Sequence, residues 1–265
     1  MKIVSWNINS LRLRINLLKK FSEISQPDII CLQETKVDDP LFPSLELLSM
    51  GYQYLEFSGE KSYNGVAILS KIPLSNIAKI DVVDYGHKRH ISAQINSNIG
   101  LIEIHNFYIP AGGDLPDATL NDKFAHKLKF IDWMYEFFKN QAQLNKKIII
   151  LGDFNIAPLE HDVWSHKQLL QVVSHTAIEV EKLNKIKNSL NFIDTHRVNV
   201  SNDQKLYSWW SYRAIDPLKS DRGRRLDHIW ITPNLGQYLN SSKIYRDFRE
   251  ENQPSDHVPI EIILK

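Results

Sequence analysis

Short polar islands adjoin strand-like hydrophobic runs along the whole length of this 265-residue chain. Their side chains include carboxylates, amides and one imidazole. Hard oxygen ligands, together with a histidine backed by acids, are the groups that metal-assisted hydrolysis of a phosphate ester requires. We therefore predict a single site, assembled by folding from Asn7, Gln33–Lys36, Tyr108, Gly152–Asn155 and Ser255–His257.

The most specific island is Gly152-Asp153-Phe154-Asn155, which follows the apolar run 148–151. Such a continuous run is typical of a strand that is buried on both faces. The glycine permits a tight turn, and Asp153 and Asn155 are two residues apart, so both project to one side of an extended chain. The alternative is an ordinary turn or helix N-cap at a strand-to-helix junction, and the pattern alone leaves both open.

Glu34 interrupts an apolar run at a point that should lie near the core. A carboxylate in such a place needs a cation, a hydrogen-bond network or a metal ion. Lys36 could pair with it as an ordinary ion pair, and the residues themselves do not decide between these partners. Asn7 and Asn9 stand where the first strand ends, and asparagine at such a position is by itself typical of a turn.

Asp256 and His257 stand before the last apolar run, between two prolines. A lone histidine is more often structural than catalytic, but an aspartate that holds its imidazole would shift that expectation. Asp227, at the start of another strand, is a candidate for this aspartate. Other histidines show no metal-ligand spacing and are interpreted as surface or packing residues, among them His161, His166, His175 and His196.

The segment Tyr207–Arg213 and the residues after it combine aromatic and positive side chains. One interpretation is a half-buried strand followed by a solvated loop that Asp216 and Asp221 partly neutralise. The other is a nucleic-acid surface, where indoles contact bases or sugars and guanidinium groups hold phosphates. The density of aromatic residues favours the second interpretation. The cations concerned are Arg213, Lys219, Arg222, Arg224 and Arg225.

Composition sets further bounds on function. The formal net charge is +1, so an anionic partner must be met by a local patch. The single cysteine, Cys31, excludes an internal disulfide framework, fits a reducing compartment and is expected to be a buried structural thiol. No apolar stretch is long enough to cross a bilayer. We expect a soluble, intracellular protein.

The order of predicted elements indicates the fold class. Strands and helices interleave, but several strands are consecutive, which argues against a purely parallel doubly wound sheet. Two mixed sheets packed face to face, with helices outside, fit better, as one domain over residues 1–265. Helices are predicted through Leu13–Ile24 and over 121–139, 159–170 and 177–189. Strands are predicted at 2–6, 28–33, 52–57, 65–70, 90–96, 101–108, 147–152, 206–211, 227–232, 243–248 and 258–264.

Seven short segments also occur in a characteristic order: Ser5–Arg12, Leu32–Lys36, Tyr63–Ser70, Asn106–Pro110, Gly152–Asn155, Arg224–Asp227 and Pro254–His257. In this order the chain resembles the exonuclease III family of abasic-site (AP) endonucleases, within the endonuclease/exonuclease/phosphatase superfamily. The Gln-Glu-Thr-Lys, Gly-Asp-x-Asn and Ser-Asp-His segments alone would indicate only the superfamily. The Asn-Ile-Asn-x-Leu-Arg start, the Trp-Trp-Ser-Tyr block and Arg-x-Asp indicate its DNA-repair branch.

This resemblance implies a DNase I-like, four-layer α/β sandwich with the site at one edge of two mixed β-sheets. It implies that Glu34 is the principal ligand of Mg²⁺, for which Mn²⁺ can substitute, with Asn7 and Asp256 at or near the ion. Hard oxygen donors and few carboxylates suit Mg²⁺, which keeps several waters. Asp153 and Asn155 are the residues of a potential second metal site.

The resemblance also implies catalytic and DNA-binding roles. Asp153 would activate the attacking water or protonate the leaving oxygen, and Asn155 would stabilise the pentacovalent phosphate. His257, aligned by Asp227, would bond a phosphate oxygen or act as the base, and Tyr108 would sit against the scissile phosphate. Lys36 and Arg89 would grip flanking phosphates, and the remaining DNA contacts would come from Trp209, Trp210, Tyr212 and Arg213.

On an extended strand Trp210 and Tyr212 share one side and Trp209 takes the other, so we expect one side to enter the core and the other to line the abasic pocket. The resemblance places both tryptophans near that pocket. Some residues depart from certain relatives: Asn9 replaces an aspartate, the loop after Tyr108 lacks an asparagine and an arginine, and Arg213 replaces an apolar wedge. These departures leave the balance of AP-endonuclease and exonuclease activities open.

The leading prediction is a Mg²⁺-dependent DNA phosphodiesterase of base excision repair. It would cut on the 5′ side of an abasic nucleotide in double-stranded DNA and remove nucleotides or blocking groups from 3′ ends. We expect a cytoplasmic monomer that associates with the nucleoid when it acts and does not associate with a membrane. One alternative is a superfamily phosphatase or phospholipid diesterase on a small or membrane substrate. Another is a DNA-binding module with a degenerate site, which the intact set of chemical residues disfavours.

Overall fold

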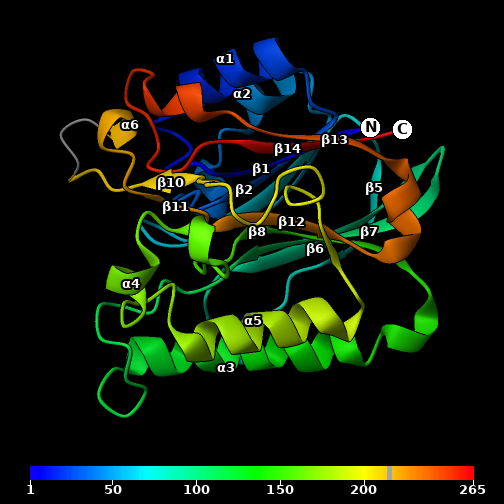
Figure 1. The fold of residues 1–265 in the computed structure, drawn as a ribbon. Helices are drawn as coiled ribbons and strands as arrows, with labels where there is room; N and C mark the ends of the chain where they lie inside the picture. Colours follow the sequence, from blue (N-terminus) through cyan, green and yellow to red (C-terminus); the bar gives the residue numbers. More distant parts are fainter. Residues whose placement is uncertain (214–216) are drawn as a thin grey trace.

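Two six-stranded β-sheets face each other between two layers of helices in the computed structural model, which describes residues 1–213 and 217–265 (Figure 1). In the first sheet only β1 and β2 run parallel, and in the second only β7 and β8 do. The predicted fold class, two mixed sheets packed face to face with helices outside, is confirmed.

The first sheet has the order β13 (Leu239–Ile244), β14 (Ile260–Leu264), β1 (Lys2–Asn7), β2 (Ile29–Gln33), β4 (Val66–Ser70) and β3 (Tyr54–Ser58). The second has the order β5 (Leu74–Ala78), β6 (His90–Ser97), β7 (Gly100–Tyr108), β8 (Lys147–Asp153), β12 (Asp227–Ile231) and β9 (Ile193–Asp194). A small separate sheet pairs β10 (Trp209–Trp210) with β11 (Gly223–Arg224).

Helices α1 (Ile15–Ser25) and α2 (Ser44–Ser49) cover the first sheet, and α3 (Asp122–Lys139) and α5 (Ala177–Ser189) cover the second (Figure 1). The short helices α4 (His166–Leu169) and α6 (Pro217–Ser220) lie near the small sheet. Short 3₁₀ turns are η1 (Asp39–Leu41), η2 (Val82–Asp84), η3 (Ala142–Leu144), η4 (Glu160–Asp162), η5 (Pro233–Tyr238) and η6 (Arg246–Arg249). No helix in the described part of the chain is long and apolar enough to span a membrane.

The continuous apolar runs of the sequence are explained by sheets that are covered on both faces. In β8, Ile149 and Leu151 point into the core between the sheets, whereas Ile148 and Ile150 pack in the cluster under α3 and α5. On the outer face of the first sheet, Trp6 packs edge-on against Phe21 of α1. Alternate residues of each inner strand therefore serve two different hydrophobic cores.

The predictions of α1, α3 and α5 were right, and in α3 and α5 a side-chain cap accompanies the apolar face. Asn121 caps α3 by accepting a hydrogen bond from the Lys123 amide, and Thr176 and Glu179 form a capping box at the start of α5. The predicted helix 159–170 is wrong: it consists of η4, an extended stretch and four residues of α4. The reason is that Asp162 is buried by ion pairs to arginines that lie far along the chain.

Strand predictions in the last third of the chain were partly wrong. The predicted strand 206–211 is only two residues long as β10, and 243–248 ends at Ile244, where η6 soon begins. Strands β5 and β9 and helix α2 were not predicted. The β5 strand lies at a sheet edge and is partly exposed, so its sequence shows little of the apolar pattern that marks a covered strand.

The two sheets are joined by hydrogen bonds next to the edge where the polar islands end. The Gln33 side-chain nitrogen donates to Asn106 Oδ1 (2.7 Å) and Ser5 Oγ (3.1 Å). The Asn106 side chain in turn donates to the carbonyl groups of Leu32 (2.9 Å) and Ala67 (3.0 Å). Because these side chains are buried, the network fixes the strand ends of the two sheets relative to each other.

Candidate active site

Strand register brings the predicted catalytic residues to one edge of the paired sheets. Asp153 at the end of β8 lies opposite Asp227 in antiparallel β12 and beside Tyr108 at the end of parallel β7. Gly152 makes this possible, since a Cβ at this position would collide with the Phe107 carbonyl oxygen and its φ is +136°. Tyr108 and Asp153 at the ends of two strands and Asp227 at the start of a third are therefore neighbours in space.

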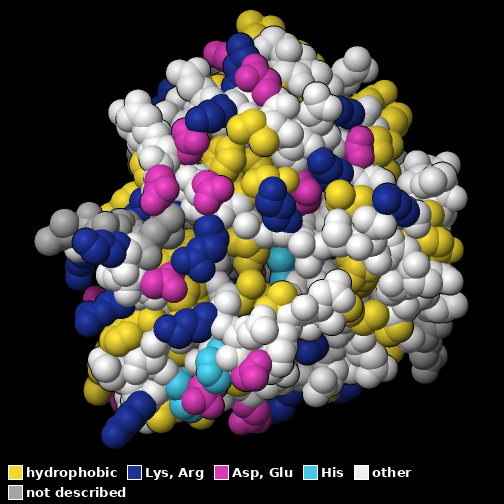
Figure 2. Space-filling view, turned by 45° about the horizontal axis from the view of Figure 1, so that its top comes forward, with side chains coloured by type: hydrophobic (Ala, Val, Ile, Leu, Met, Phe, Trp, Pro, Cys, Tyr) yellow, Lys and Arg dark blue, Asp and Glu magenta, His cyan; other side chains and the backbone are white. Residues whose placement is uncertain are grey.

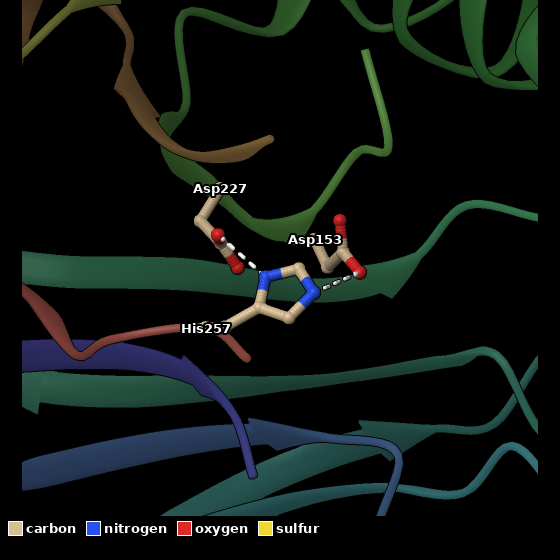
Figure 3. Close-up of side chains that lie close together, drawn as sticks. All are labelled: Asp153, Asp227 and His257. Carbon is tan, nitrogen blue, oxygen red and sulfur yellow. Dashed lines mark hydrogen bonds and ion pairs between the residues drawn. The ribbon is translucent and has the colours of Figure 1, made fainter. Parts of the chain in front are cut away.

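His257 lies between two aspartates, as Figure 3 shows. Its Nδ1 is 2.8 Å from Asp227 Oδ2, and its Nε2 is 3.6 Å from Asp153 Oδ2. Ser208 Oγ donates to the same Asp227 oxygen at 2.6 Å. The three charged side chains are 1–4% exposed. The predicted partnership of Asp227 with the His257 imidazole is therefore present in the structure.

Electrostatics set the protonation of this cluster. Burial opposes the charge on His257, but Asp227 and Asp153 outweigh it and raise the pKa of His257 to about 10. Burial raises the pKa of Asp153 to about 7, with His257 opposing and Asp227 adding to the rise. His257 is thus an imidazolium at neutral pH, whereas Asp153 is able to exchange a proton there.

Asn7 is the centre of the hydrogen bonds that connect these residues. Its amide nitrogen donates to Glu34 Oε1 and Asp153 Oδ2, both at 2.9 Å, and lies 3.4 Å from His257 Nε2. Its amide oxygen accepts from the Asn9 backbone (3.1 Å). Asn7 thus presents a donor, not a ligand oxygen, to Glu34 in this arrangement. Its predicted place beside a metal ion stays a prediction.

Glu34 is held by three donors. Tyr108 donates its hydroxyl to Oε1 at 2.7 Å, and Lys36 Nζ lies 2.7 Å from Oε2. Burial alone would raise the pKa of Glu34, but Lys36 and the hydrogen bonds from Asn7 and Tyr108 lower it. Burial and the Glu34 charge raise the pKa of Tyr108, so the phenol keeps its proton. The ion pair with Lys36 that the sequence left open is formed.

Two carboxylates on the pocket wall are suitable for a hard cation. Glu34 and Asp256 both line a pocket of about 550 Å³. Burial would raise the pKa of Asp256, but His257 and hydrogen bonds from Asn9 and Trp209 lower it, so both groups are anionic. Asn9 and Lys36 connect them, since Asn9 donates to Asp256 Oδ1 (2.9 Å) and accepts from Lys36 (2.6 Å), which pairs with Glu34. This all-oxygen donor set fits a divalent ion such as Mg²⁺.

A second group of ligands could be formed by the acid–histidine cluster itself. One atom each of Asp153, Asp227 and His257 lie within 4.8 Å of one another, close enough to hold a metal ion. However, Asp227 already bonds His257 Nδ1, and Asn155 donates to Asp153 Oδ2 at 3.1 Å. We interpret this cluster as an acid–base unit, and the second metal site at Asp153 and Asn155 stays a prediction.

Arg89 lies beside Tyr108, not in the solvent. It is 3% exposed, its guanidinium stacks 4.5 Å from the centre of the Tyr108 ring, and it donates to the Tyr108 carbonyl (3.3 Å) and the Tyr63 hydroxyl (3.4 Å). Because its donors face groups of the protein, this placement gives no support to its predicted grip on a flanking phosphate. Arg89 instead holds Tyr108 in place.

The two neighbouring tryptophans take different environments. Trp210 is 1% exposed and packs in the core beneath the first sheet, whereas Trp209 lines the pocket and donates Nε1–H to Asp256 Oδ2 at 2.9 Å. The prediction that Tyr212 shares the side of Trp210 is wrong, because the strand ends at Trp210 and the chain turns. Tyr212 is 49% exposed and bonds Arg14 (2.8 Å). Arg213 lines the pocket, and its predicted contact with DNA stays a prediction.

The profile of the endonuclease/exonuclease/phosphatase family matches residues 4–257. The chain belongs to this family. It is 32% identical to an exodeoxyribonuclease III of Haemophilus influenzae over 98% of each chain. Its fold matches an AP endonuclease of Archaeoglobus fulgidus with a TM-score of 0.91 and 28% identity, over 100% of this chain and 99% of that one. A Neisseria 3′ phosphatase bound to a product DNA hairpin matches with the same TM-score, identity and coverage.

One wall of the pocket in this family member was not predicted. It is formed by Val172, Val173 and Ser174, which stand in the loop between α4 and α5. Arg224 also lines the pocket, and it donates to the Val173 carbonyl at 3.1 Å. These valines carry no chemical signal in the sequence, since their type and spacing equally suit a buried helix or strand.

Proposed function

We propose that this protein is a Mg²⁺-dependent DNA phosphodiesterase that cuts on the 5′ side of abasic nucleotides and removes nucleotides or blocking groups from 3′ ends. The observation that carries the proposal is the buried chain Asp227–His257–Asp153 beside Glu34, at the base of a pocket with an indole and arginines on its wall. The similarity of this protein to an exodeoxyribonuclease III, an AP endonuclease and a DNA-bound 3′ phosphatase supports the same chemistry.

The charges of the site suggest a catalytic role for each of its residues. Asp153, with a pKa of about 7, takes the proton of the attacking water, whose oxygen then bonds to phosphorus as the bond to the 3′ oxygen breaks. His257, already protonated and held by Asp227, donates a hydrogen bond to a phosphate oxygen. Asn155 and Tyr108 would contact the same phosphate, and the leaving 3′ oxygen takes up a proton from solvent.

Glu34 and Asp256 would hold the Mg²⁺ ion, or Mn²⁺ in its place, with Asn7 beside them. Such an ion supplies Lewis-acid stabilisation of the charge on the phosphate oxygens. Lys36 neutralises Glu34 in the present arrangement, so it would have to move toward a DNA phosphate when a cation binds. This exchange of partners accounts for a lysine so close to the principal ligand.

The pocket wall fits a sugar without a base. Trp209, Val172, Val173 and Leu226 provide apolar surface, and Arg213 and Arg224 provide positive charge at its rim. Figure 2 shows Lys and Arg side chains, interspersed with acidic ones, along the edge of the molecule that carries α6, β10 and β11. This local patch is suited to double-stranded DNA despite the net charge of +1. We propose a cytoplasmic monomer that works at the nucleoid.

The test uses three duplexes that differ at one position: one with an abasic analogue, one intact and one with a 3′-phosphate at a nick. Each is incubated with the protein and Mg²⁺, Mn²⁺ or a chelator, and the products are separated on a denaturing gel. We expect incision 5′ to the abasic analogue and removal of the 3′-phosphate only with a divalent ion. A folded protein that cleaves none of them with either ion would overturn the proposal.

A further inference from the structure

Beneath the pocket lies a buried ion pair that takes no part in the chemistry described above. Lys127 of α3 and Glu179 of α5 are both completely inaccessible to solvent, and Lys127 Nζ is 2.5 Å from Glu179 Oε1. A pair of charges removed from water in this way carries a large desolvation penalty, and apolar residues of the same size often provide equal or greater stability. The pair therefore calls for an explanation other than stability.

The ammonium group of Lys127 connects two segments of the pocket. Besides Glu179, it donates to the carbonyl oxygen of Asn155 (2.8 Å) and to that of Ala111 (3.2 Å). Asn155 follows β8 and Ala111 follows β7, and both line the pocket. The three donors of the ammonium group thus meet three acceptors, one carboxylate and two catalytic-loop carbonyls.

Glu179 connects the third segment. Its carboxylate accepts hydrogen bonds from the backbone amides of Ser174 (2.9 Å to Oε2) and Thr176 (3.2 Å), and from the Thr176 hydroxyl (2.7 Å). Ser174 stands on the pocket wall that the sequence did not reveal, with φ of +87°. The ion pair therefore joins three of the loops that line the pocket, those that follow β7 and β8 and the one that precedes α5.

The packing around Lys127 leaves little room for other arrangements. Gly112, with φ of +91°, approaches it so closely that a Cβ there would lie 2.9 Å from Lys127 Cδ and 3.0 Å from Val173 Cγ1. Gly112 of the loop after β7 thus packs against both the aliphatic stem of Lys127 and Val173 of the loop before α5. A shift of this side chain would be transmitted to both.

The pose of Asn155 depends on this contact. Asn155 has φ of +52°, a conformation that turns its carbonyl inward to Lys127 while its side-chain amide donates to Asp153 Oδ2 (3.1 Å) and the Ile109 carbonyl (3.0 Å). If the carbonyl lost its donor, the left-handed conformation would lose the interaction that offsets its strain. The amide would then no longer be held against Asp153.

We propose that Lys127 and Glu179 are positioning residues: they set Asn155, and through it Asp153, in the geometry for catalysis without touching the substrate. This inference rests on the proposed function of Asn155 and Asp153. It is the hydrogen bonds of Lys127 to the loop carbonyls that position the site, and Glu179 keeps the ammonium group charged and the third loop in place.

The test compares K127M, E179Q and the double variant K127M/E179Q. Methionine matches the stem of lysine without its donors, and glutamine still suits the capping box of α5. Each single change leaves a buried charge without its partner and should lower the melting temperature by roughly 6–20 °C, whereas the double variant should regain most of that loss. K182M is the matched control, because Lys182 and Asp132 form an ion pair (2.5 Å) between the same two helices at the surface.

In the double variant we expect kcat on an abasic duplex to stay roughly 10- to 100-fold below wild type, with KM changed less than about threefold, since misplaced catalytic groups act mainly on turnover. E179Q should retain more activity than K127M. Recovery of wild-type kcat together with stability in the double variant would mean that the pair is only structural. An equal loss of kcat in K182M would also overturn the proposal.

Hydrogen exchange provides a readout that does not depend on activity. In the double variant, the backbone amide of Asn155, which donates to Asp153 Oδ1 at 2.9 Å, should exchange at least about tenfold faster than in wild type and in K182M at matched stability. Unchanged exchange there refutes the positioning role. If the wild type cleaves no abasic duplex, the proposed function fails, but this exchange difference still tests the link between Lys127 and Asn155.

Discussion

The neighbouring residues Trp209 and Trp210 allow substrate recognition to be separated from stability by two adjacent substitutions. Trp210 is fully buried, packs edge-on against Tyr207 (6.2 Å between ring centres), and lies under the guanidinium of Arg246 (5.2 Å). Trp210→Ala should therefore cost about 3–5 kcal/mol of folding free energy. For a chain of this size that corresponds to a fall in melting temperature of roughly 6–20 °C.

Trp209 is half-buried on the pocket wall, where its ring faces Arg224 (5.4 Å) and its indole N–H bonds Asp256. Removing an aromatic group that contacts a nucleic-acid substrate costs roughly 1–3 kcal/mol of binding, which is about a 5- to 150-fold loss. We expect Trp209→Ala to reduce the ratio of kcat/KM for abasic over intact duplex by that factor, with a smaller change in melting temperature than Trp210→Ala causes.

The assay measures cleavage of both duplexes and thermal unfolding for each variant. Trp209→Phe retains an aromatic ring without the hydrogen bond to Asp256. It therefore distinguishes the contribution of the ring to substrate preference from the contribution of the hydrogen bond. Trp133→Ala, on α3 where the indole stacks on Phe137, is the control for loss of a half-buried tryptophan away from the site. The reasoning is refuted if Trp209→Ala loses only stability, or if Trp210→Ala changes the substrate ratio and leaves the melting temperature unaltered.

Three further predictions follow from the charges. Burial opposes the charge of His257 and Asp227 favours it, so Asp227→Asn should lower the pKa of His257. The alkaline limb of the kcat–pH profile should then move to lower pH, and kcat should fall at least tenfold. An alkaline limb at unchanged pH would contradict this role of Asp227. Glu34→Gln should raise the Mg²⁺ concentration needed for half-maximal cleavage by about tenfold or more, because the ligand loses its charge. A metal titration measures this concentration, and an unaltered titration rules Glu34 out as a required ligand. Although burial opposes it, Arg225 lowers the pKa of Asp194 from 3.8 to about 2, so Asp194 contributes about 2–3 kcal/mol of stability above pH 4 that is lost as the pH falls from 4 to 2. Urea unfolding across this range should show a shallower loss in Asp194→Asn, and an equal slope in both proteins would exclude this contribution.

The sequence by itself was sufficient for the fold class, for most strands of the two sheets and for the placement of several polar residues at one sheet edge. An apolar run such as 148–151 must be a strand covered on both faces, and a polar group directly after it must emerge at a sheet edge. That rule correctly placed Glu34 and Asp153, His257 joins them from just before the last strand, and the aspartate expected to hold His257 is indeed Asp227. These features depend on periodicity and on residue type, both of which are local.

Only the tertiary structure decided which polar and aromatic residues are buried. The sequence groups Arg225 with the cations of a DNA-binding surface, but Arg225 is 1% exposed between Asp162 (2.7 Å) and Asp194 (2.8 Å). Trp209 and Trp210 could not be told apart, because alternation on a strand assigns them opposite sides without saying which side is the core. Asp216 lies outside the described residues.

The same limit applies to Lys127 and to the valines of the pocket wall. A lysine in the middle of a helix is ordinarily solvated, and it becomes a completely buried hydrogen-bond donor here because Glu179 comes from another helix, 52 positions along the chain. Burial of a charge depends on a partner, and partners far apart in sequence are brought together only by the packing of whole elements. The polar residues at the sheet edge are therefore evident in the sequence, whereas the buried charges that pack beneath them are evident only in the fold.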